Sequence, residues 1–452
     1  MMNAHMKRRE FFKTSTLAGT GLALGAGGLA TRAFAEVDGK PAILGGKPVV
    51  TQGFPSWPVY DETEEKALLS TLHSGHWFRG SGANVGRFED AYSKLTGAKH
   101  CLATSCGTSA LFTALGALDV GPGDEVIIPP YTFVATYNAV VLNYALPIFA
   151  DSDLETFQID PKKIGAAVTP QTRAIVPVHL GGSVADLDSI LAIGEKQKVP
   201  VVEDACQAHL AEWKGRKVGT WGRAGCFSFQ ASKNLNSGEG GALLTNDDDF
   251  ASVCYNFHNQ GRARQSTGYS FAYSGSRGSN LRLSEFQAGI LLAQMTRLEA
   301  QARQRSSNAE YLTSILKDIE GIMPAKMYAN CTRNAYHLYM FRFLKDRFDG
   351  LERGKFLQAL QKEGVPCSSG YEPLNKDKYV QALTQSRHYR KLYTEAELKH
   401  WTERNSCPQN DQLCSQAVWL TQNMLLGPRS SMDQIADAIR RIRKNAPEIA
   451  RG

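Results

Sequence analysis

The chain has 452 residues, of which 42% are hydrophobic and 21% charged, and its formal net charge is +7. This composition is that of a globular protein with a large core, and the length suggests two to three domains. The charge is raised by a basic N-terminal cluster and by the run RRIRK near the C-terminus. Because no long basic stripe with interleaved aromatic residues lies between them, the sequence argues against nucleic-acid binding.

Residues 1–35 have the pattern of a twin-arginine export signal. Arg8 and Arg9 lie in KRREFFK, a glycine-rich apolar segment follows, and AFA ends at Ala35 like a small-residue cleavage site. The apolar segment is shorter than the ~20 residues that a membrane-spanning helix needs. We therefore expect passage through the twin-arginine export machinery, cleavage before Glu36, no permanent membrane anchor, and a periplasmic or otherwise exported protein.

Nine cysteines are scattered along the chain. Their odd number and irregular spacing do not predict a disulfide framework. Cys407 and Cys414 have no accompanying histidine pair, so we expect no metal site.

Seven short hydrophobic runs predict strands that are buried on both faces, as in a mostly parallel sheet. They are residues 101–105, 125–129, 146–151, 173–178, 200–204, 225–229 and 241–245. Segments with helical spacing, such as TSALFTALGAL, alternate with them. The pattern predicts an α/β fold with a sheet between helices.

The pattern of predicted elements changes near residue 300. A long helical pattern runs from Ser284 to Ile319, and a strand (335–343), a helix (355–364) and a terminal helix (431–444) follow. We predict a large α/β domain with an N-terminal arm over residues 36–300 and a smaller α+β domain over residues 301–452.

Ligands of such sheets bind beyond the carboxyl ends of the strands. Gly107, Thr108 and Ser109 follow the first strand where a helix begins. Backbone N–H groups and hydroxyls at a helix N-terminus bind anions, although a plain helix cap has the same signature. Asp204 ends the strand 200–204, and Gln207 follows three residues later. That acid could be a helix cap, a metal ligand or the partner of a protonated ring nitrogen.

A single lysine, Lys233, follows Ser228 by five residues and precedes the glycine-rich NSGEGG. A lysine in such a loop indicates a phosphate contact or a Schiff base, and the Walker pattern of nucleotide-binding loops is absent. A phosphate cradle, an acid and a lysine after successive strands together meet the needs of pyridoxal 5'-phosphate. Phe133, just beyond the strand 125–129, offers a flat surface for its ring.

Several motifs in one order resemble the DegT and StrS sugar-aminotransferase family of fold-type I pyridoxal-phosphate enzymes. They are CGTSALFTAL, GDEVIIPPYTFVAT, AIVPVHLGG, VVEDACQAH, CFSFQASKNLNSGEGGALLTND and GSNLRLSEFQAGI. The resemblance covers roughly residues 42 to 440. It implies a large domain with a mostly parallel seven-stranded sheet and a smaller C-terminal α+β domain.

The resemblance also implies residue roles. Lys233 would hold the cofactor covalently and move protons, and Asp204 would bind the pyridinium nitrogen. The remaining cofactor-binding positions would surround the ring and its phosphate: Gly107, Thr108, Ser109, Phe133, Gln207 and Ser228. Asn280, in GSNLRL, resembles an asparagine that reaches the phosphate of the neighbouring subunit's cofactor, which implies a homodimer with shared active sites.

Four further residues match stretches of the family that approach the substrate. Trp77 and Arg79 lie in a loop that would close over the substrate, and His337 and Tyr371 lie in the C-terminal part. Residues 378–406 look like an insertion relative to the family, and we expect a lid or a contact surface there.

The implied reaction is a ping-pong transamination from glutamate or glutamine to a keto-sugar or keto-cyclitol. Two alternatives remain open. One is an exported protein that binds or senses ligands and keeps the cofactor without turnover. The other is a pyridoxal-phosphate-dependent sugar dehydratase; the dehydratases of this family replace the lysine with histidine, so Lys233 argues against it.

Overall fold

A computed structural model describes residues 39–264 and 272–451. The expected export signal over residues 1–35 lies outside the described residues. Within the described ranges, no helix combines the length and the apolar character needed to span a bilayer.

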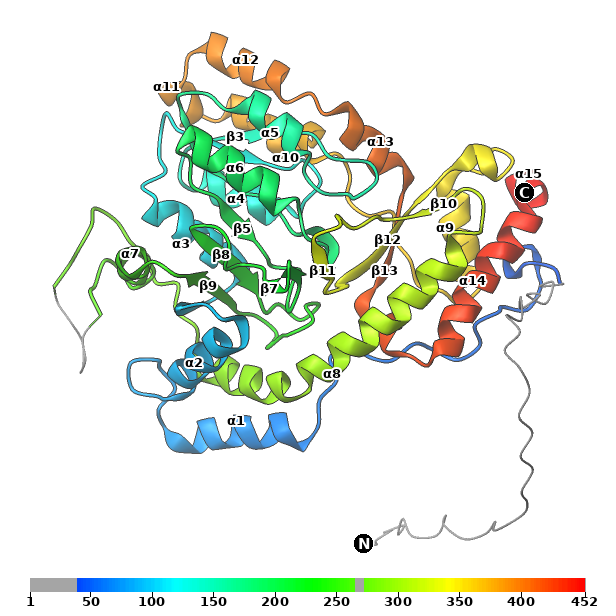
Figure 1. Cartoon of the computed structure of the whole chain (residues 1–452), viewed down its shortest axis with the longest axis horizontal. Helices are drawn as coiled ribbons and strands as arrows, with labels where there is room; N and C mark the ends of the chain where they lie inside the picture. The colour runs from blue at the N-terminus through cyan, green and yellow to red at the C-terminus, as the bar shows by residue number, and fades with distance from the viewer. Residues whose placement is uncertain (1–38, 265–271, 452) are drawn as a thin grey trace, which may run out of the picture. The chain divides into compact units, whose positions relative to one another are not determined.

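Seven strands form the central sheet, and they coincide with the seven predicted runs (Figure 1). Four pair in the order β1-β9-β8-β5 and three in the order β3-β2-β4, with parallel bridges Ile175–Val201 and Val178–Asp204 between the groups. The strands are β1 (His100–Thr104), β2 (Glu125–Ile128), β3 (Leu146–Phe149), β4 (Thr172–Ile175), β5 (Val202–Asp204), β8 (Ala224–Ser228) and β9 (Gly241–Thr245). Only the β9 pairings are antiparallel within these two groups, so the prediction of a mostly parallel sheet is confirmed.

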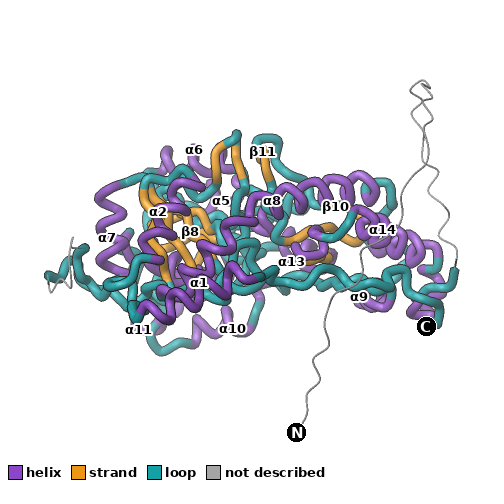
Figure 2. Tube along the Cα trace, turned by 90° about the horizontal axis from the view of Figure 1, so that it is seen from below, coloured by secondary structure: helices purple, strands orange, loops and turns teal. Residues whose placement is uncertain are grey.

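Helices lie on both sides of this sheet (Figure 2). Alternate residues of one strand face opposite sides: Leu243 of β9 belongs to one hydrophobic cluster, whereas Ala242 and Leu244 belong to another. The first cluster includes residues of α3 (Gly107–Ala117), α4 (Val134–Val141), α5 (Pro161–Ala167), α6 (Leu187–Gln197) and α7 (Asp248–His258). The second includes residues of α2 (Asn84–Thr96) and α8 (Glu285–Leu316), and α1 (Glu62–Ser74) packs against α8.

The long helix α8 carries the chain into a second, antiparallel sheet. A capping box begins the helix: the Ser284 hydroxyl accepts from the N–H of Gln287, and the Gln287 side chain accepts from the N–H of Ser284. The second sheet has the order β10-β12-β13, and α9 (Arg353–Lys362), α14 (Arg429–Lys444) and α15 (Ala446–Arg451) pack with it. Its strands are β10 (Ile322–Pro324), β12 (Leu338–Phe343) and β13 (Ala417–Thr421). Residue 300 lies inside α8, and the division into two domains there stays a prediction.

A small three-stranded sheet, β11-β6-β7, lies beside the large one. Its strands are β6 (Glu212–Trp213), β7 (Arg216–Lys217) and β11 (Cys331–Arg333).

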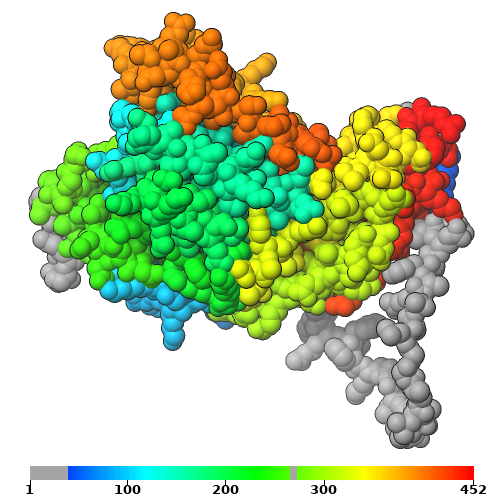
Figure 3. Space-filling view, turned by 45° about the horizontal axis from the view of Figure 1, so that its top comes forward, coloured from blue at the N-terminus to red at the C-terminus, as the bar shows by residue number. Residues whose placement is uncertain are grey.

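The segment 378–406 covers the outer edge of β3. It contains α10 (Lys378–Gln381), α11 (Tyr389–Leu392) and α12 (Glu395–Arg404), and α13 (Pro408–Gln416) follows. The Tyr389 hydroxyl donates to Ala145 O (2.8 Å), the Trp401 indole donates to Pro147 O (2.7 Å), and Phe149 N–H donates to the Asn405 side chain (2.7 Å). These are alternate residues of the strand, on the side that does not pair with β2. The segment, orange in Figure 3, therefore satisfies with its side chains the edge that a sheet otherwise leaves open.

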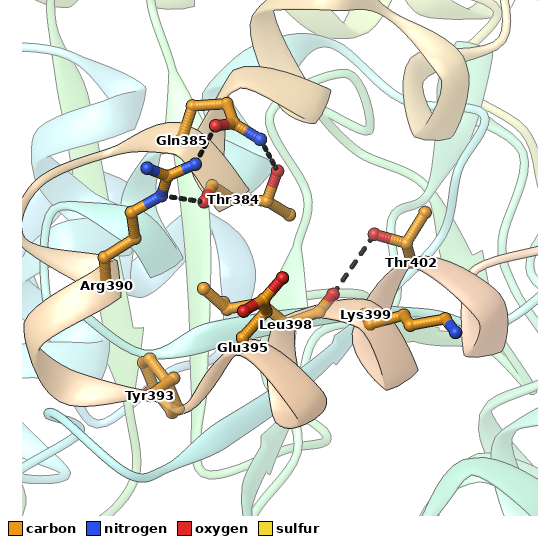
Figure 4. Close-up of a pocket in the computed structure, with 8 residues that line it drawn as sticks. All are labelled: Thr384, Gln385, Arg390, Tyr393, Glu395, Leu398, Lys399 and Thr402. Atoms are coloured by element: carbon orange, nitrogen blue, oxygen red, sulfur yellow. Dashed lines mark hydrogen bonds between the residues drawn. The ribbon is translucent and has the colours of Figure 1, made fainter.

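The same segment forms a surface hollow of about 470 Å³ (Figure 4). Arg390 donates to Thr384 O (3.1 Å) and to the Gln385 side chain, and the Thr402 hydroxyl donates to Leu398 O (3.2 Å). The Tyr393 hydroxyl, by contrast, accepts from Gly123 N–H (2.9 Å) and donates to Tyr144 O (3.3 Å), so it ties the segment to the large domain.

Candidate active site

A cavity of about 480 Å³ lies beyond the carboxyl ends of β1, β2, β5 and β8. Nine of the residues predicted for the site line it: Gly107, Thr108, Phe133, Asp204, Gln207, Ser228, Lys233, His337 and Tyr371. No described residue of the segment 378–406 lines this cavity. The strand ends therefore bring together residues that are up to 264 positions apart in the sequence, from Gly107 to Tyr371.

The first turn of α3 forms one wall. A Cβ atom placed on Gly107 would lie 2.7 Å from the Cβ of Ser228 and 2.9 Å from the Sγ of Cys206. Only glycine permits this approach, which brings the backbone N–H groups of a helix N-terminus to the cavity. Ser109 lies differently: its hydroxyl contacts Ser105 Oγ (2.9 Å) and Cys106 Sγ (3.1 Å), and it does not line the cavity.

The end of β8 is held in place by a histidine. The His209 Nε2 lies 2.8 Å from Ser228 O, and burial lowers the pKa of His209 to about 3. The ring is therefore neutral near pH 7 and donates to this carbonyl. His209 thus fixes the backbone of Ser228, a role that needs no contact with a ligand.

Asp204 is buried at the end of β5, with 4% of its surface exposed. Its Oδ2 accepts from the Thr136 hydroxyl (2.8 Å), and its Oδ1 accepts from Cys206 N–H (3.2 Å). Thr136 in turn contacts the Thr132 hydroxyl at 2.9 Å. Sequence reasoning missed both threonines, although they lie in PPYTFVAT at the spacing of one helical turn.

Lys233 lies in the loop that joins β8 to β9. The loop is closed by Ala231 N–H donating to Gly238 O (2.9 Å) and Phe229 N–H donating to Gly240 O (2.7 Å). Gly238 and Gly240 have φ values of +83° and +148°, which favour glycine. Burial lowers the pKa of the Lys233 ammonium, and the nearby thiol of Cys206 and carboxylate of Asp204 oppose that shift.

Among the described residues, none lies within hydrogen-bonding or ion-pairing distance of the Lys233 ammonium. A partly buried amine with a lowered pKa and no partner loses its proton more readily, and the neutral amine is the form that attacks a carbonyl carbon.

A hydrogen bond between Gln207 and Tyr371 connects the segment after β5 to the segment before β13 at the cavity. The Gln207 carbonyl accepts from Gly181 N–H (2.7 Å), and its amide donates to the Tyr371 hydroxyl (3.3 Å). The Tyr371 ring packs edge-on against Trp419, with 4.6 Å between centroids. Trp419 also lines the cavity, and no sequence motif singled it out.

Two aromatic or heteroaromatic side chains complete the wall. Phe133 lines the cavity with 56% of its surface exposed, so one ring face is open to a ligand. His337 is buried, and its Nδ1 lies 3.3 Å from Asn234 Oδ1. Burial lowers the pKa of His337 well below its ordinary value, with a smaller contribution from the Lys233 charge, so its ring is neutral.

Besides Ser109, three predicted residues are not brought to the cavity of this subunit. Arg79 pairs with Glu89 (2.9 Å) and both side chains are buried, whereas Trp77 is half exposed. Asn280 is exposed and bridges to Asn259. The substrate roles of Trp77 and Arg79 and the inter-subunit role of Asn280 stay predictions.

The cavity fits pyridoxal 5'-phosphate. The N-terminus of α3 at Gly107 and Thr108, together with Ser228, offers N–H and hydroxyl groups to an anion. Lys233 offers an unpartnered amine, Asp204 a carboxylate, and Phe133 an open ring face. With the fold, this site defines a pyridoxal-phosphate-dependent enzyme of the aminotransferase class.

Comparison with known proteins identifies the family. The DegT/DnrJ/EryC1/StrS aminotransferase family matches residues 58–440, and the chain belongs to this family. It is 36% identical over 420 residues to the L-glutamine:2-deoxy-scyllo-inosose aminotransferase of Streptoalloteichus tenebrarius, covering 90% of this chain and 98% of that protein. It is 34% identical over 397 residues to the 3-amino-5-hydroxybenzoate synthase of Amycolatopsis mediterranei, covering 86% and 98%.

The fold agrees with that family. A crystal structure of a 3-amino-5-hydroxybenzoic acid synthase superimposes with a TM-score of 0.76 at 32% identity, over 88% of this chain and 99% of that one. The protein is thus a pyridoxal-phosphate-dependent sugar or cyclitol aminotransferase.

Replacing Gly107 with alanine should weaken binding of pyridoxal phosphate by about tenfold or more, because the new methyl group collides with Ser228 and Cys206. Titration of the cofactor-free protein by absorbance measures this. Gly165→Ala is the matched control, since its Cβ would meet nothing within 4 Å in the helix α5. Equal affinity in Gly107→Ala and the wild type would place the phosphate elsewhere.

Proposed function

We propose that this enzyme transfers the amino group of glutamine to a ketone on a carbocyclic polyol. The observation that carries the proposal is that the amine of Lys233 and the carboxylate of Asp204 line the same cavity. The names of the relatives described above support glutamine as donor and a cyclitol ketone as acceptor.

The charges of the cavity wall favour an uncharged acceptor. Among the described residues that line it, Lys233 is the single cationic side chain, Asp204 and Glu239 are acidic, and His337 is neutral. A nucleotide-activated sugar carries a diphosphate that needs opposite charge or N–H donors. This wall offers such groups at the α3 N-terminus, where they would be taken by the cofactor phosphate.

Each residue has a chemical task in this proposal. Bound pyridoxal phosphate supplies an aldehyde that accepts an amino group and a ring that withdraws electrons. The Lys233 amine takes a proton from the substrate carbon and returns it, since its pKa is lowered by burial. Asp204 would accept a hydrogen bond from the protonated ring nitrogen, Phe133 would cover one ring face, and the N–H groups beside Gly107 would hold the phosphate.

The half-reactions test this proposal. Glutamine added to the purified holoenzyme should convert the bound cofactor to its amino form, seen as a change in the visible spectrum, and glutamate should do so more slowly. In Lys233→Ala the conversion should fall by a factor of at least about 10³, because the base is lost. Borohydride reduction followed by peptide mapping should mark Lys233 in the wild type.

Two outcomes would contradict the proposal. A bound cofactor that no amine converts favours a binding or sensing protein, and normal turnover by Lys233→Ala places the base at another residue. Lys399→Ala is the matched control, because Lys399 is exposed and lies outside the cavity.

We further propose a homodimer with shared active sites. Leu68, Leu69 and Leu72 on α1 are exposed by 36–46%, and Trp77 beyond the helix by 52%. An apolar face of this kind favours burial against a second copy. Sedimentation should give twice the monomer mass, and Asn280→Ala should weaken cofactor binding if Asn280 reaches the partner's site. A monomer with full cofactor affinity would refute the shared site.

We also propose export by the twin-arginine route, on the pattern of residues 1–35. The expected result is a mature protein in the exported fraction with Glu36 as its first residue, determined by mass spectrometry. Replacing Arg8 and Arg9 with lysine should leave the protein in the cytoplasmic fraction. Identical fractionation of both proteins would exclude this route.

A further inference from the structure

Two threonines connect the buried carboxylate of Asp204 to the first turn of α4. The Thr136 hydroxyl lies 2.8 Å from Asp204 Oδ2 and 2.9 Å from the Thr132 hydroxyl. Both threonines are 2% exposed, and both line the cavity.

The direction of these hydrogen bonds follows from the ionised carboxylate. A carboxylate only accepts, so Thr136 donates its hydrogen to Asp204. Because Thr136 has no second hydroxyl hydrogen, Thr132 is the donor and Thr136 the acceptor in the contact between the two hydroxyls. The result is a directed chain, Thr132 to Thr136 to Asp204, in which each bond polarises the next.

An ordinary structural role explains these contacts less well. A threonine inside a helix usually bonds its hydroxyl to the carbonyl three or four residues earlier. The hydroxyl of Thr136 instead bonds to two side chains. Phe133 is the N-cap residue of α4, so one short stretch at the start of this helix supplies both the ring-stacking surface and the donor to the carboxylate.

We propose that Thr136, supported by Thr132, is a positioning residue that holds the Asp204 carboxylate oriented toward the ring nitrogen of the cofactor. The inference rests on the proposed function, in which Asp204 makes that contact. Because Cys206 N–H donates to Oδ1, loss of the Thr136 hydroxyl removes the donor to Oδ2 and leaves the carboxylate less firmly oriented.

The test measures cofactor affinity before activity. In Thr136→Val, which keeps the side-chain shape, the dissociation constant of pyridoxal phosphate measured by equilibrium dialysis should rise about tenfold. Thr136→Ser, which keeps the hydroxyl, should restore it to within about twofold. The kcat of the glutamine half-reaction should fall with Thr136→Val, while the KM for glutamine stays nearly unchanged.

Thr113→Val is the matched control. Thr113 is a fully buried threonine of α3 whose hydroxyl has no hydrogen-bond partner in the described part of the chain, so its replacement should leave the affinity unchanged. If Thr136→Val does not fold, Thr132→Val removes the support without touching the Asp204 contact and should raise the dissociation constant about threefold.

A double-mutant cycle separates positioning from packing. If Thr136 acts through Asp204, Thr136→Val should have little further effect on affinity in the Asp204→Asn background. An equal loss in both backgrounds, or wild-type affinity in Thr136→Val, would overturn the inference. If the wild-type protein binds the cofactor but no amine converts that cofactor, the proposed function is refuted. The dissociation constants of the Thr136 variants still decide whether Thr136 acts through Asp204.

Discussion

The site depends on one close contact, the approach of the α3 backbone at Gly107 to the end of β8 and to Cys206. No side chain fits between these segments. The contact sets how near the helix N-terminus lies to Ser228, and β8 leads directly into the loop of Lys233. Since β5 pairs with β8 in parallel, the position of Asp204 is fixed by the same contact. Anion cradle, carboxylate and amine are therefore arranged by backbone geometry.

Burial then adjusts the chemistry of these groups. It lowers the pKa of Lys233, His209 and His337, so that three potential cations of one region are biased toward their neutral forms. The neutral histidines serve as hydrogen-bonding groups to Ser228 and Asn234. The anionic group that the cavity retains deep in its wall, Asp204, is surrounded by donors from Thr136 and Cys206. A cofactor with a cationic ring nitrogen and an anionic phosphate complements this distribution.

Much of this could be predicted from the sequence. Buried strands are visible as continuous hydrophobic runs, and the rule that ligands bind at their carboxyl ends points to Gly107, Asp204, Ser228 and Lys233. Thr132, Thr136 and Trp419 could not be predicted, because their importance comes from a partner that only the tertiary fold brings near. Ser109 shows the reverse. It lies in the first turn of α3 as the sequence predicts, but its hydroxyl contacts Ser105 and Cys106 and does not line the cavity.

Side chains of the segment 378–406 complete the sheet beside β3. The expectation of a lid or a contact surface in this segment stays a prediction. A strand edge is normally completed by another strand, whereas here a tyrosine, a tryptophan and an asparagine perform that task. In a chimera with a shorter linker, two carbonyls and one amide of β3 would be open to pairing with another chain. Such a chimera should self-associate through this open edge. Its substrate specificity should not change, because no described residue of the segment 378–406 lines the active-site cavity.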